Sequence, residues 1–220
     1  MDANETLAQD RQLHESYSRR GINLHRVDAI RRHAGRSVLD VGCGNGAYVL
    51  ELRDEFEIAG VDHQSYESWD EAPDSFSVVD ANRLPQKDEA IDTVTAFEVL
   101  EHLSDPKASL LEWKRVCRKN LIVTVPNCEQ SPGLKSSLLV HSHYTDRTHV
   151  NFFTRETLRD LVEDCGFEIR ELELINAISP WPFLIEAIQF EGLAGKLARR
   201  YCAKHINRHP ITLMLVAEKH

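Results

Sequence analysis

Short apolar runs rich in β-branched residues alternate with longer segments of helical periodicity along this chain. The runs that predict strands are SVLDVG (37–42), EIAGVD (57–62), FSVVDA (76–81), AIDTVTAFE (90–98), NLIVTVPN (120–127), FEIRELELI (167–175) and ITLMLVAEK (211–219). The segments that predict helices are 47–56, 105–119 and 154–166. Strands that alternate with helices indicate βαβ units, and therefore an α/β protein with a mostly parallel sheet.

Three stretches fall outside this alternation. Residues 1–36 predict an amphipathic N-terminal helical segment, which precedes a domain over 37–220. Residues 127–151 show no periodicity, and a loop of that length inside a compact domain is usually functional. Residues 179–208 predict a helical insertion that becomes basic towards its end. The insertion either packs on the sheet edge or, through 181–208, makes peripheral contact with a membrane.

Composition indicates which compartment and which class of partner to expect. Hydrophobic residues make up 42% of the 220 residues and charged residues 28%, with a formal net charge of −9. An acidic total argues against broad electrostatic binding to nucleic acid, so we expect no nucleic-acid partner. The five cysteines have no CxxC spacing, the N-terminus is polar, and no apolar run is long enough for a membrane span. We therefore expect a cytoplasmic protein.

The stretch VLDVGCGNG predicts a tight turn between a strand and a helix, with glycines at positions 42, 44 and 46. Such a turn lets the backbone approach a ligand closely, beside the positive end of a helix. By spacing alone it suits a dinucleotide pyrophosphate as well as other nucleoside ligands. Asp62, at the end of the next strand, is placed to bind ribose hydroxyls in either case.

Two further carboxylates separate these ligands. Asp40 lies inside the strand before the turn, where it would repel a pyrophosphate but attract an ammonium group. Asp80 ends the third strand, where an acceptor for an adenine amino group is expected. The pattern therefore favours an adenosine joined to a zwitterionic tail, and it disfavours an NAD-dependent oxidoreductase.

VLDVGCGNG, GVDHQ, VVDANRLP and IDTVTAFEVLEHL together resemble the successive motifs of class I S-adenosylmethionine-dependent methyltransferases. The resemblance covers roughly residues 37–175 and the final strand. It implies a Rossmann-like, seven-stranded, mostly parallel sheet with helices on both faces and the last strand antiparallel. It also implies S-adenosyl-L-methionine as the cofactor. One departure is CRKN, which replaces the usual Pro-Gly-Gly turn before the fifth strand.

By motif position, the resemblance also assigns the cofactor site. The residues it places around the cofactor are Asp40, Gly42, Cys43, Gly44, Gly46, Asp62, His63, Asp80, Ala81 and Phe97. Asp62 is expected to bind the ribose hydroxyls, with His63 beside the adenine. Asp80 is expected to accept from the adenine amino group next to the backbone of Ala81. Phe97 is expected to line the pocket.

The stretch FEVLEHL carries Glu98, Glu101 and His102 at positions i, i+3 and i+4, which share one face if the stretch is helical. Three interpretations stay open. In the first, the three residues and His149 bind a divalent cation such as Mg²⁺, Mn²⁺ or Zn²⁺. In the second, His102 or His149 is a metal-free general base, with Glu98 as a further catalytic candidate. In the third, the stretch is a helix start without a chemical role.

EVLEHL followed by a distant histidine before FFT resembles small-RNA 2′-O-methyltransferases, and ubiquinone-pathway O-methyltransferases share its first half. His141 and His143 are weaker candidates than His149, which directly precedes an apolar pair and a predicted helix. We expect methyl transfer from S-adenosylmethionine to an oxygen of a small metabolite, a saccharide or a lipid-linked intermediate. The alternatives are 2′-O-methylation of an RNA 3′ end and a non-catalytic partner subunit that binds S-adenosylmethionine.

Overall fold

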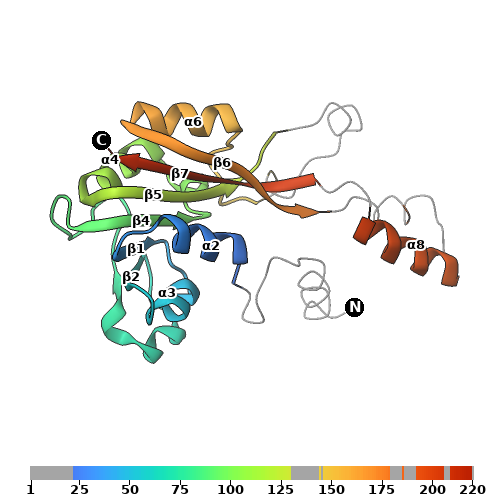
Figure 1. Ribbon diagram of the computed structural model, residues 1–220, viewed down its shortest axis with the longest axis horizontal. Coiled ribbons are helices and arrows are strands. Elements are labelled where there is room, and N and C mark those ends of the chain that lie inside the picture. Colours follow the sequence, from blue (N-terminus) through green and yellow to red (C-terminus); the bar gives the residue numbers. More distant parts are fainter. Residues whose placement is uncertain are drawn as a thin grey trace.

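A twisted sheet of seven strands runs through the computed structural model (Figure 1). The structure describes residues 22–129, 144, 146–178, 185, 192–205 and 209–219. The strands are β1 (Ser37–Val41), β2 (Glu57–Asp62), β3 (Phe76–Val78), β4 (Ile91–Phe97), β5 (Cys117–Pro126), β6 (Phe167–Ile178) and β7 (His209–Lys219). Their spatial order is β3-β2-β1-β4-β5-β7-β6. Strands β1 to β5 are parallel, and β7 is antiparallel to both of its neighbours, which confirms the predicted fold class.

The helices are α2 (Leu24–His33), α3 (Ala47–Leu52), α4 (Pro106–Val116), α6 (Arg155–Asp164) and α8 (Gly192–His205). Local capping fixes the start of two of them. Asp105 caps α4 by accepting from the backbone N–H of Ala108, with Pro106 in the first turn. Thr154 and Thr157 form a reciprocal capping box at the start of α6. Both starts agree with the sequence prediction.

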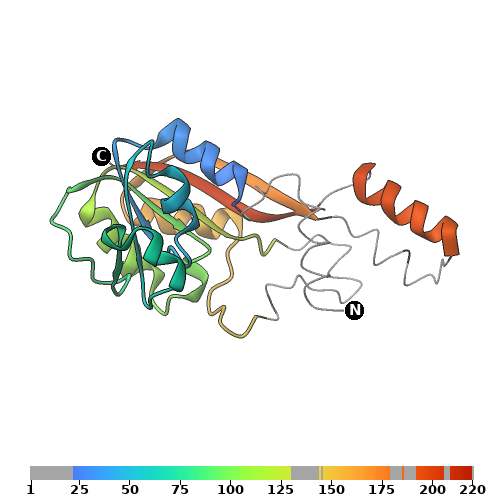
Figure 2. The same cartoon turned by 90° about the horizontal axis from the view of Figure 1, so that it is seen from below.

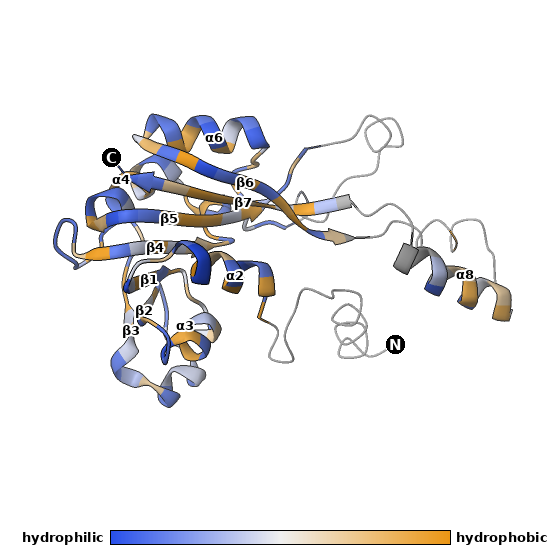
Figure 3. Cartoon of the chain, viewed as in Figure 1, coloured by the Kyte–Doolittle hydropathy of each residue, from blue (hydrophilic) through white to orange (hydrophobic). Residues whose placement is uncertain are grey.

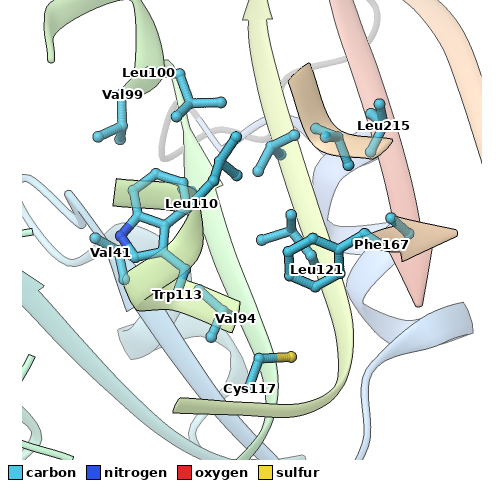
Figure 4. Close-up of a cluster of buried hydrophobic side chains, with 14 of the residues drawn as sticks. Val41, Val94, Val99, Leu100, Leu110, Trp113, Cys117, Leu121, Phe167 and Leu215 are labelled. Atoms are coloured by element: carbon cyan, nitrogen blue, oxygen red, sulfur yellow. The ribbon is translucent and has the colours of Figure 1, made fainter. Parts of the chain in front are cut away.

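Alternate residues of each strand point to opposite faces of the sheet and form two apolar layers. Helices cover both layers. On one face, α4 and α6 pack on β1, β4, β5 and β7, with Trp113 and Leu110 at the centre of that layer (Figure 4). On the other face, α2 and α3 pack on the same strands through residues such as Ile30 and Leu52. Figure 3 shows this pattern in the colouring by hydropathy. The middle strands are largely hydrophobic, whereas α2 and α6 carry both hydrophobic and polar residues.

The carboxyl edge of the sheet is the edge at which the five parallel strands end. Strand β6 runs in the same direction as β5, because both are antiparallel to β7. The end of β6 and the start of β7 therefore lie at this edge as well, and α8 is inserted between them. In Figures 1 and 2, α8 lies beyond this end of β6 and β7, away from the other helices.

Three predicted segments overlap residues that the structure does not describe. Of the predicted N-terminal segment, α2 is described and packs into the same apolar layer as β1 and β5, whereas 1–21 lies outside the described residues. Of the predicted loop 127–151, residues 130–143 and 145 lie outside, including His141 and His143. Of the predicted insertion 179–208, residue 185 and the helix α8 over 192–205 are described, and the rest lies outside the described residues.

Candidate functional site

The glycine turn after β1 has the geometry that its sequence predicts. Gly42, Gly44 and Gly46 all have positive φ angles, of 70°, 53° and 72°. A Cβ on Gly42 would lie 2.4 Å from the Val99 side chain, and one on Gly46 would lie 2.4 Å from the ring of Phe76. Both the left-handed backbone and the close packing therefore require glycine at these two positions.

A cavity of about 340 Å³ opens beside the turn, at the carboxyl ends of β1, β2 and β3. Five of the predicted cofactor residues line it, namely Gly42, Asp62, His63, Asp80 and Ala81. It offers an acidic, partly apolar site next to a backbone turn. That combination suits the adenosine part of the predicted cofactor.

Asp62 gives a test of that fit. Its Oδ2 accepts a hydrogen bond of 2.8 Å from the backbone N–H of Gly44, which ties the turn to the end of β2. Its Oδ1 is buried 2.6 Å from Nδ1 of the exposed His63, but has no hydrogen bond of acceptable geometry within the described residues. A buried carboxylate oxygen without a hydrogen bond is costly. A ligand that brings hydroxyl groups, as ribose does, would satisfy it.

Asp40 lies behind the cavity rather than in its lining. Its side chain is buried, and its Oδ1 accepts a hydrogen bond of 2.7 Å from Thr95 on β4. Burial raises the pKa of Asp40 to about 7, although the Thr95 hydrogen bond and the Arg26 charge act in the opposite direction. Cys43 is buried in the turn, and burial also raises the pKa of its thiol. Cys43 therefore fills space there as a protonated thiol.

Two other predicted cofactor residues occupy different environments. Asp80 is exposed at the cavity rim, and its Oδ1 accepts hydrogen bonds from the backbone and the side chain of Asn82. Phe97 is buried on the far side of β4, where its ring contacts Tyr48 at 5.0 Å and Arg26 at 5.2 Å. Phe97 does not line the cavity. Contact of either residue with a cofactor stays a prediction.

The stretch after β4 does not form the helix face that the spacing of Glu98, Glu101 and His102 suggests. Strand β4 ends at Phe97, and Glu98 adopts a left-handed backbone with a φ of 57°. Only the single 3-10 turn Leu100–His102 follows. The predicted face is wrong because the left-handed residue turns the chain between Glu98 and the other two side chains.

Glu98 is held by two residues far away in the sequence. Its Oε1 accepts a hydrogen bond of 2.5 Å from the guanidinium of Arg26 on α2 and one of 2.9 Å from the hydroxyl of Thr124 on β5. The Arg26 side chain is only 11% exposed, and that of Glu98 30%. Glu98 is therefore an ion-pair partner of the N-terminal helix, which leaves it a weaker candidate for a metal ligand or a base.

Glu101 has the opposite character. Its side chain is 1% exposed, and neither carboxylate oxygen has a hydrogen-bond partner among the described residues. Burial, followed by the nearby charge of Glu98, raises the pKa of Glu101 to about 9. A fully buried carboxyl group that accepts no hydrogen bond from the described residues and has a second acid, Glu98, as its neighbour needs an explanation, and a ligand at this position would supply one.

His149 reaches Glu101 and His102 because the chain from Thr148 to Asn151 is bound to the turn after β4. The backbone N–H groups of Val150 and Asn151 both donate to the carbonyl of Glu101, at 2.8 and 3.1 Å. His102 Nδ1 lies 3.2 Å from the carbonyl oxygen of Thr148. The rings of His102 and His149 meet edge to face, with centroids 4.7 Å apart. These contacts fix both imidazoles beside the buried carboxylate.

The ligand atoms of Glu101, His102 and His149 all lie within 4.8 Å of one another. Nε2 of His102 is 3.9 Å from Oε1 of Glu101, which is too long for a hydrogen bond. One cation with bonds of about 2.0–2.2 Å could bridge such a gap. A His102 that donates through Nδ1 to a carbonyl presents its Nε2 lone pair, as metal-binding histidines commonly do. The donor set therefore fits a divalent cation, although the role of each residue stays a prediction.

Sequence reasoning missed several residues of the site. Arg26, Thr95, Leu103 and Thr124 take part through contacts between distant segments, and Thr148 orients His102 through its backbone. A general signal existed for Thr95 and Thr124, since polar side chains inside buried strands usually have a partner. No signal in the sequence pairs Arg26 with Glu98.

Comparisons with known proteins agree with this geometry. The family model described as "Methyltransferase domain" matches residues 11–172. An O-methyltransferase of Pyrenophora dematioidea is 24% identical over 214 residues, covering 90% of this chain and 80% of that protein. A protein of Mycobacterium tuberculosis, named as a probable S-adenosylmethionine-dependent methyltransferase, is 30% identical over 183 residues, covering 69% of this chain and 65% of its own length.

The chain spans only 49% of another curated relative, a Streptomyces fradiae transposon protein. Among solved structures, a SAM-dependent methyltransferase from Archaeoglobus fulgidus superposes with a TM-score of 0.63 at 20% identity, covering 89% of this chain and 91% of that one. At that identity the likeness shows the fold alone. Because the family model matches most of the chain, the chain belongs to the methyltransferase-domain family. It has the fold of class I S-adenosylmethionine-dependent methyltransferases.

Proposed function

We propose that the protein transfers the methyl group of S-adenosylmethionine to an oxygen of a small metabolite, a saccharide or a lipid-linked intermediate. In this proposal, Glu101, His102 and His149 hold a divalent cation that binds the acceptor oxygen. The observation that carries it is the buried Glu101 carboxyl group, without a hydrogen bond in the described residues, within 4.8 Å of two imidazoles.

The chemistry explains why such a cluster is useful. The sulfonium of the cofactor supplies an activated methyl group, whose bond to sulfur breaks as the bond to the acceptor oxygen forms. The acceptor hydroxyl must lose its proton, which an alcohol does not do readily near neutral pH. A cation held by one carboxylate and two imidazoles lowers the pKa of an oxygen bound to it. The remaining work of the chain is to position the acceptor and to exclude water.

The raised pKa of Glu101 predicts that cation binding depends on pH. The pKa of about 9 means that the Glu101 carboxyl group is protonated in the free protein at neutral pH. Cation binding must release that proton, so the apparent affinity rises with pH until the pKa is passed. Transfer to oxygen is supported by the Pyrenophora dematioidea relative, which is named as an O-methyltransferase.

A second candidate is a metal-free general base at the same place. The contact of His102 Nδ1 with the Thr148 carbonyl leaves Nε2 as a proton acceptor, and His149 stands 3.6 Å from Asp146 through its own Nε2. Either imidazole would then take the acceptor proton directly. Glu98 is less suited to this role because its Oε1 is already bound by Arg26 and Thr124.

Titration of the free protein with Mn²⁺, followed by calorimetry, tests the cation. We expect Mn²⁺ to bind more tightly at pH 8 than at pH 6, and Glu101→Gln to weaken binding by more than about 100-fold. Glu98→Gln is the matched control, because it removes a neighbouring carboxylate that is already held by Arg26. It should weaken Mn²⁺ binding only slightly.

Methyl incorporation from labelled S-adenosylmethionine into metabolite, glycan and lipid extracts then tests the reaction. Incorporation that EDTA stops and Mn²⁺ or Mg²⁺ restores supports the cation. If EDTA has no effect and His102→Ala slows turnover by ~10²–10⁴, the metal-free base is correct. Incorporation into the 3′ ends of RNA would replace the proposed acceptor. If S-adenosylhomocysteine binds but no extract is methylated, a non-catalytic subunit is the better description.

A further inference from the structure

The helix α8 presents large apolar side chains to solvent. Leu193, Leu197 and Tyr201 are spaced by four and are 76%, 61% and 63% exposed. That spacing places the three side chains along one side of the helix. On the opposite side, Gly195 is buried and Ala198 is half-buried. A helix that stabilised its own chain by apolar packing would have the reverse orientation.

Basic side chains run beside this apolar stripe. Lys196 and Arg200 are exposed, and each follows a leucine of the stripe by three positions, which makes them its neighbours on the helix surface. Over its length α8 has four lysines and arginines and no acidic residue, within a chain whose formal net charge is −9. The helix α8 therefore combines an exposed apolar stripe with positive charge, in a chain that is acidic as a whole.

We propose that α8 binds an anionic lipid surface, with Leu193, Leu197 and Tyr201 inserted among the acyl chains and Lys196 and Arg200 at the headgroups. An exposed apolar stripe flanked by lysine and arginine is the pattern of helices that lie in the membrane interface. The acidic remainder of the chain would be repelled by the same lipids, so the contact is restricted to the helix. Among the described helices, none has the length and apolar content needed to cross a bilayer.

The position of α8 would turn the edge of the sheet that carries the site towards a bound membrane. The helix is inserted between the end of β6 and the start of β7, at the same edge of the sheet as the glycine turn and the Glu101 cluster. A protein held to a membrane through α8 would therefore approach it with the edge that carries the site. Lipid-linked acceptors are, for this reason, the class of the proposed acceptors that this surface favours, a point that rests on the proposed function.

Flotation of the whole chain with vesicles tests lipid binding without any need for methyl transfer. The probes are vesicles of phosphatidylcholine alone and vesicles that also contain phosphatidylserine, each at low and at high salt. We expect binding to the phosphatidylserine vesicles only, and less of it at high salt. The double substitution Lys196→Ala/Arg200→Ala should weaken binding on the order of 30-fold, from about one kcal/mol for each basic residue.

The double substitution Leu193→Ser/Leu197→Ser should weaken vesicle binding by about tenfold for each leucine, since the apolar area that enters the lipid is lost. Leu111→Ser is the matched control, because Leu111 is a leucine on α4 that is 48% exposed and lies outside the stripe. S-adenosylhomocysteine binding should be the same in all three variants, which shows that each is folded and separates this test from that of the function.

Three results would overturn the inference. The first is no flotation with phosphatidylserine vesicles, and the second is flotation that neither double substitution weakens. The third is a dimer by light scattering that Leu193→Ser/Leu197→Ser converts to monomer, since the stripe would then bind a second copy of the chain.

Discussion

The two halves of the carboxyl edge are built by different means. The half beside β1, β2 and β3 depends on backbone conformation, because Gly42, Gly44 and Gly46 set the turn and one carboxylate, Asp62, fastens it. The half beside β4 and β5 depends on side chains from distant segments. There, Arg26 of α2 and the chain before α6 are brought to the turn after β4.

Each half also contains a buried carboxyl group, and the two are treated differently. Burial raises the pKa of both groups and the charge of Arg26 lowers both, but Asp40 also accepts a hydrogen bond from Thr95, so its pKa rises only to about 7. Glu101 has no such hydrogen bond and lies near the charge of Glu98, so its pKa rises to about 9. In the half beside β1, β2 and β3, the cofactor half, one oxygen of Asp62 has no hydrogen bond in the described residues. In the half beside β4 and β5, the acceptor half, both oxygens of Glu101 are in that state.

The comparison predicts that the largest loss comes from a single methyl group in the turn. Gly46→Ala places a Cβ 2.4 Å from the Phe76 ring on a backbone with a φ of 72°. Strain and overpacking together should cost about 3 kcal/mol, which lowers the melting temperature by roughly 6–12 °C. S-adenosylhomocysteine affinity, measured by calorimetry, should fall by more than about 100-fold.

The control for this substitution is Gly192→Ala. Gly192 has a φ of 76°, but a Cβ there would have no neighbour within 4 Å. This variant should lose about 1 kcal/mol of stability and keep the affinity for S-adenosylhomocysteine. Equal losses of affinity in the two variants would show that the turn does not form the cofactor site.

The next effect, in the acceptor half, comes from Arg26. Arg26→Gln leaves Glu98 and the buried Glu101 without their nearby cation, which should cost about 1–3 kcal/mol and lower the melting temperature by roughly 2–12 °C. Arg31→Gln on the same helix breaks an ion pair with Glu55 at the same distance of 2.5 Å. Because Arg31 and Glu55 are 49% and 41% exposed, solvent screens this pair and that loss should be much smaller. Equal losses would mean that Arg26 serves only as a surface residue.

The same contrast explains how far the sequence could be read. The strands follow from apolar runs along the chain, and the glycine turn follows from residues within a short stretch, so both are predictable. The ends of α4 and α6 follow from the local caps at Asp105 and Thr154. All of these features depend on neighbours in the sequence.

The acceptor half was harder to predict because its contacts join distant residues. The pairing of Arg26 with Glu98 spans 72 positions, and the left-handed backbone of Glu98 has no sequence signal comparable to a glycine. The spacing of Glu98, Glu101 and His102 therefore suggests a helix face that the structure does not contain. Even so, Glu101, His102 and His149 do meet, because strand ends converge at this edge whatever the conformation between them.

The smallest predicted effect concerns Asp40, the residue that connects the two halves through the charge of Arg26. Its ionised form attracts an ammonium group, and its pKa of about 7 means that the ionised fraction rises between pH 6 and pH 8. One pH unit on each side of the pKa changes that fraction from about a tenth to about nine tenths. The affinity for S-adenosylhomocysteine should therefore rise by about tenfold over this range and level off above it.

Calorimetry at several pH values measures this directly, and Asp40→Asn should give a flat, low affinity because the side chain can no longer ionise. The control is Asp62→Asn, which should weaken binding at every pH while the slope that belongs to Asp40 persists. The sign for folding is the reverse. Since burial raises the pKa of Asp40 above its unfolded value, the free protein binds more protons than the unfolded chain and loses stability as pH rises towards 7. An affinity that falls over pH 6–8 would show that Asp40 does not face an ammonium group, and that the cofactor half is organised differently from the site described above.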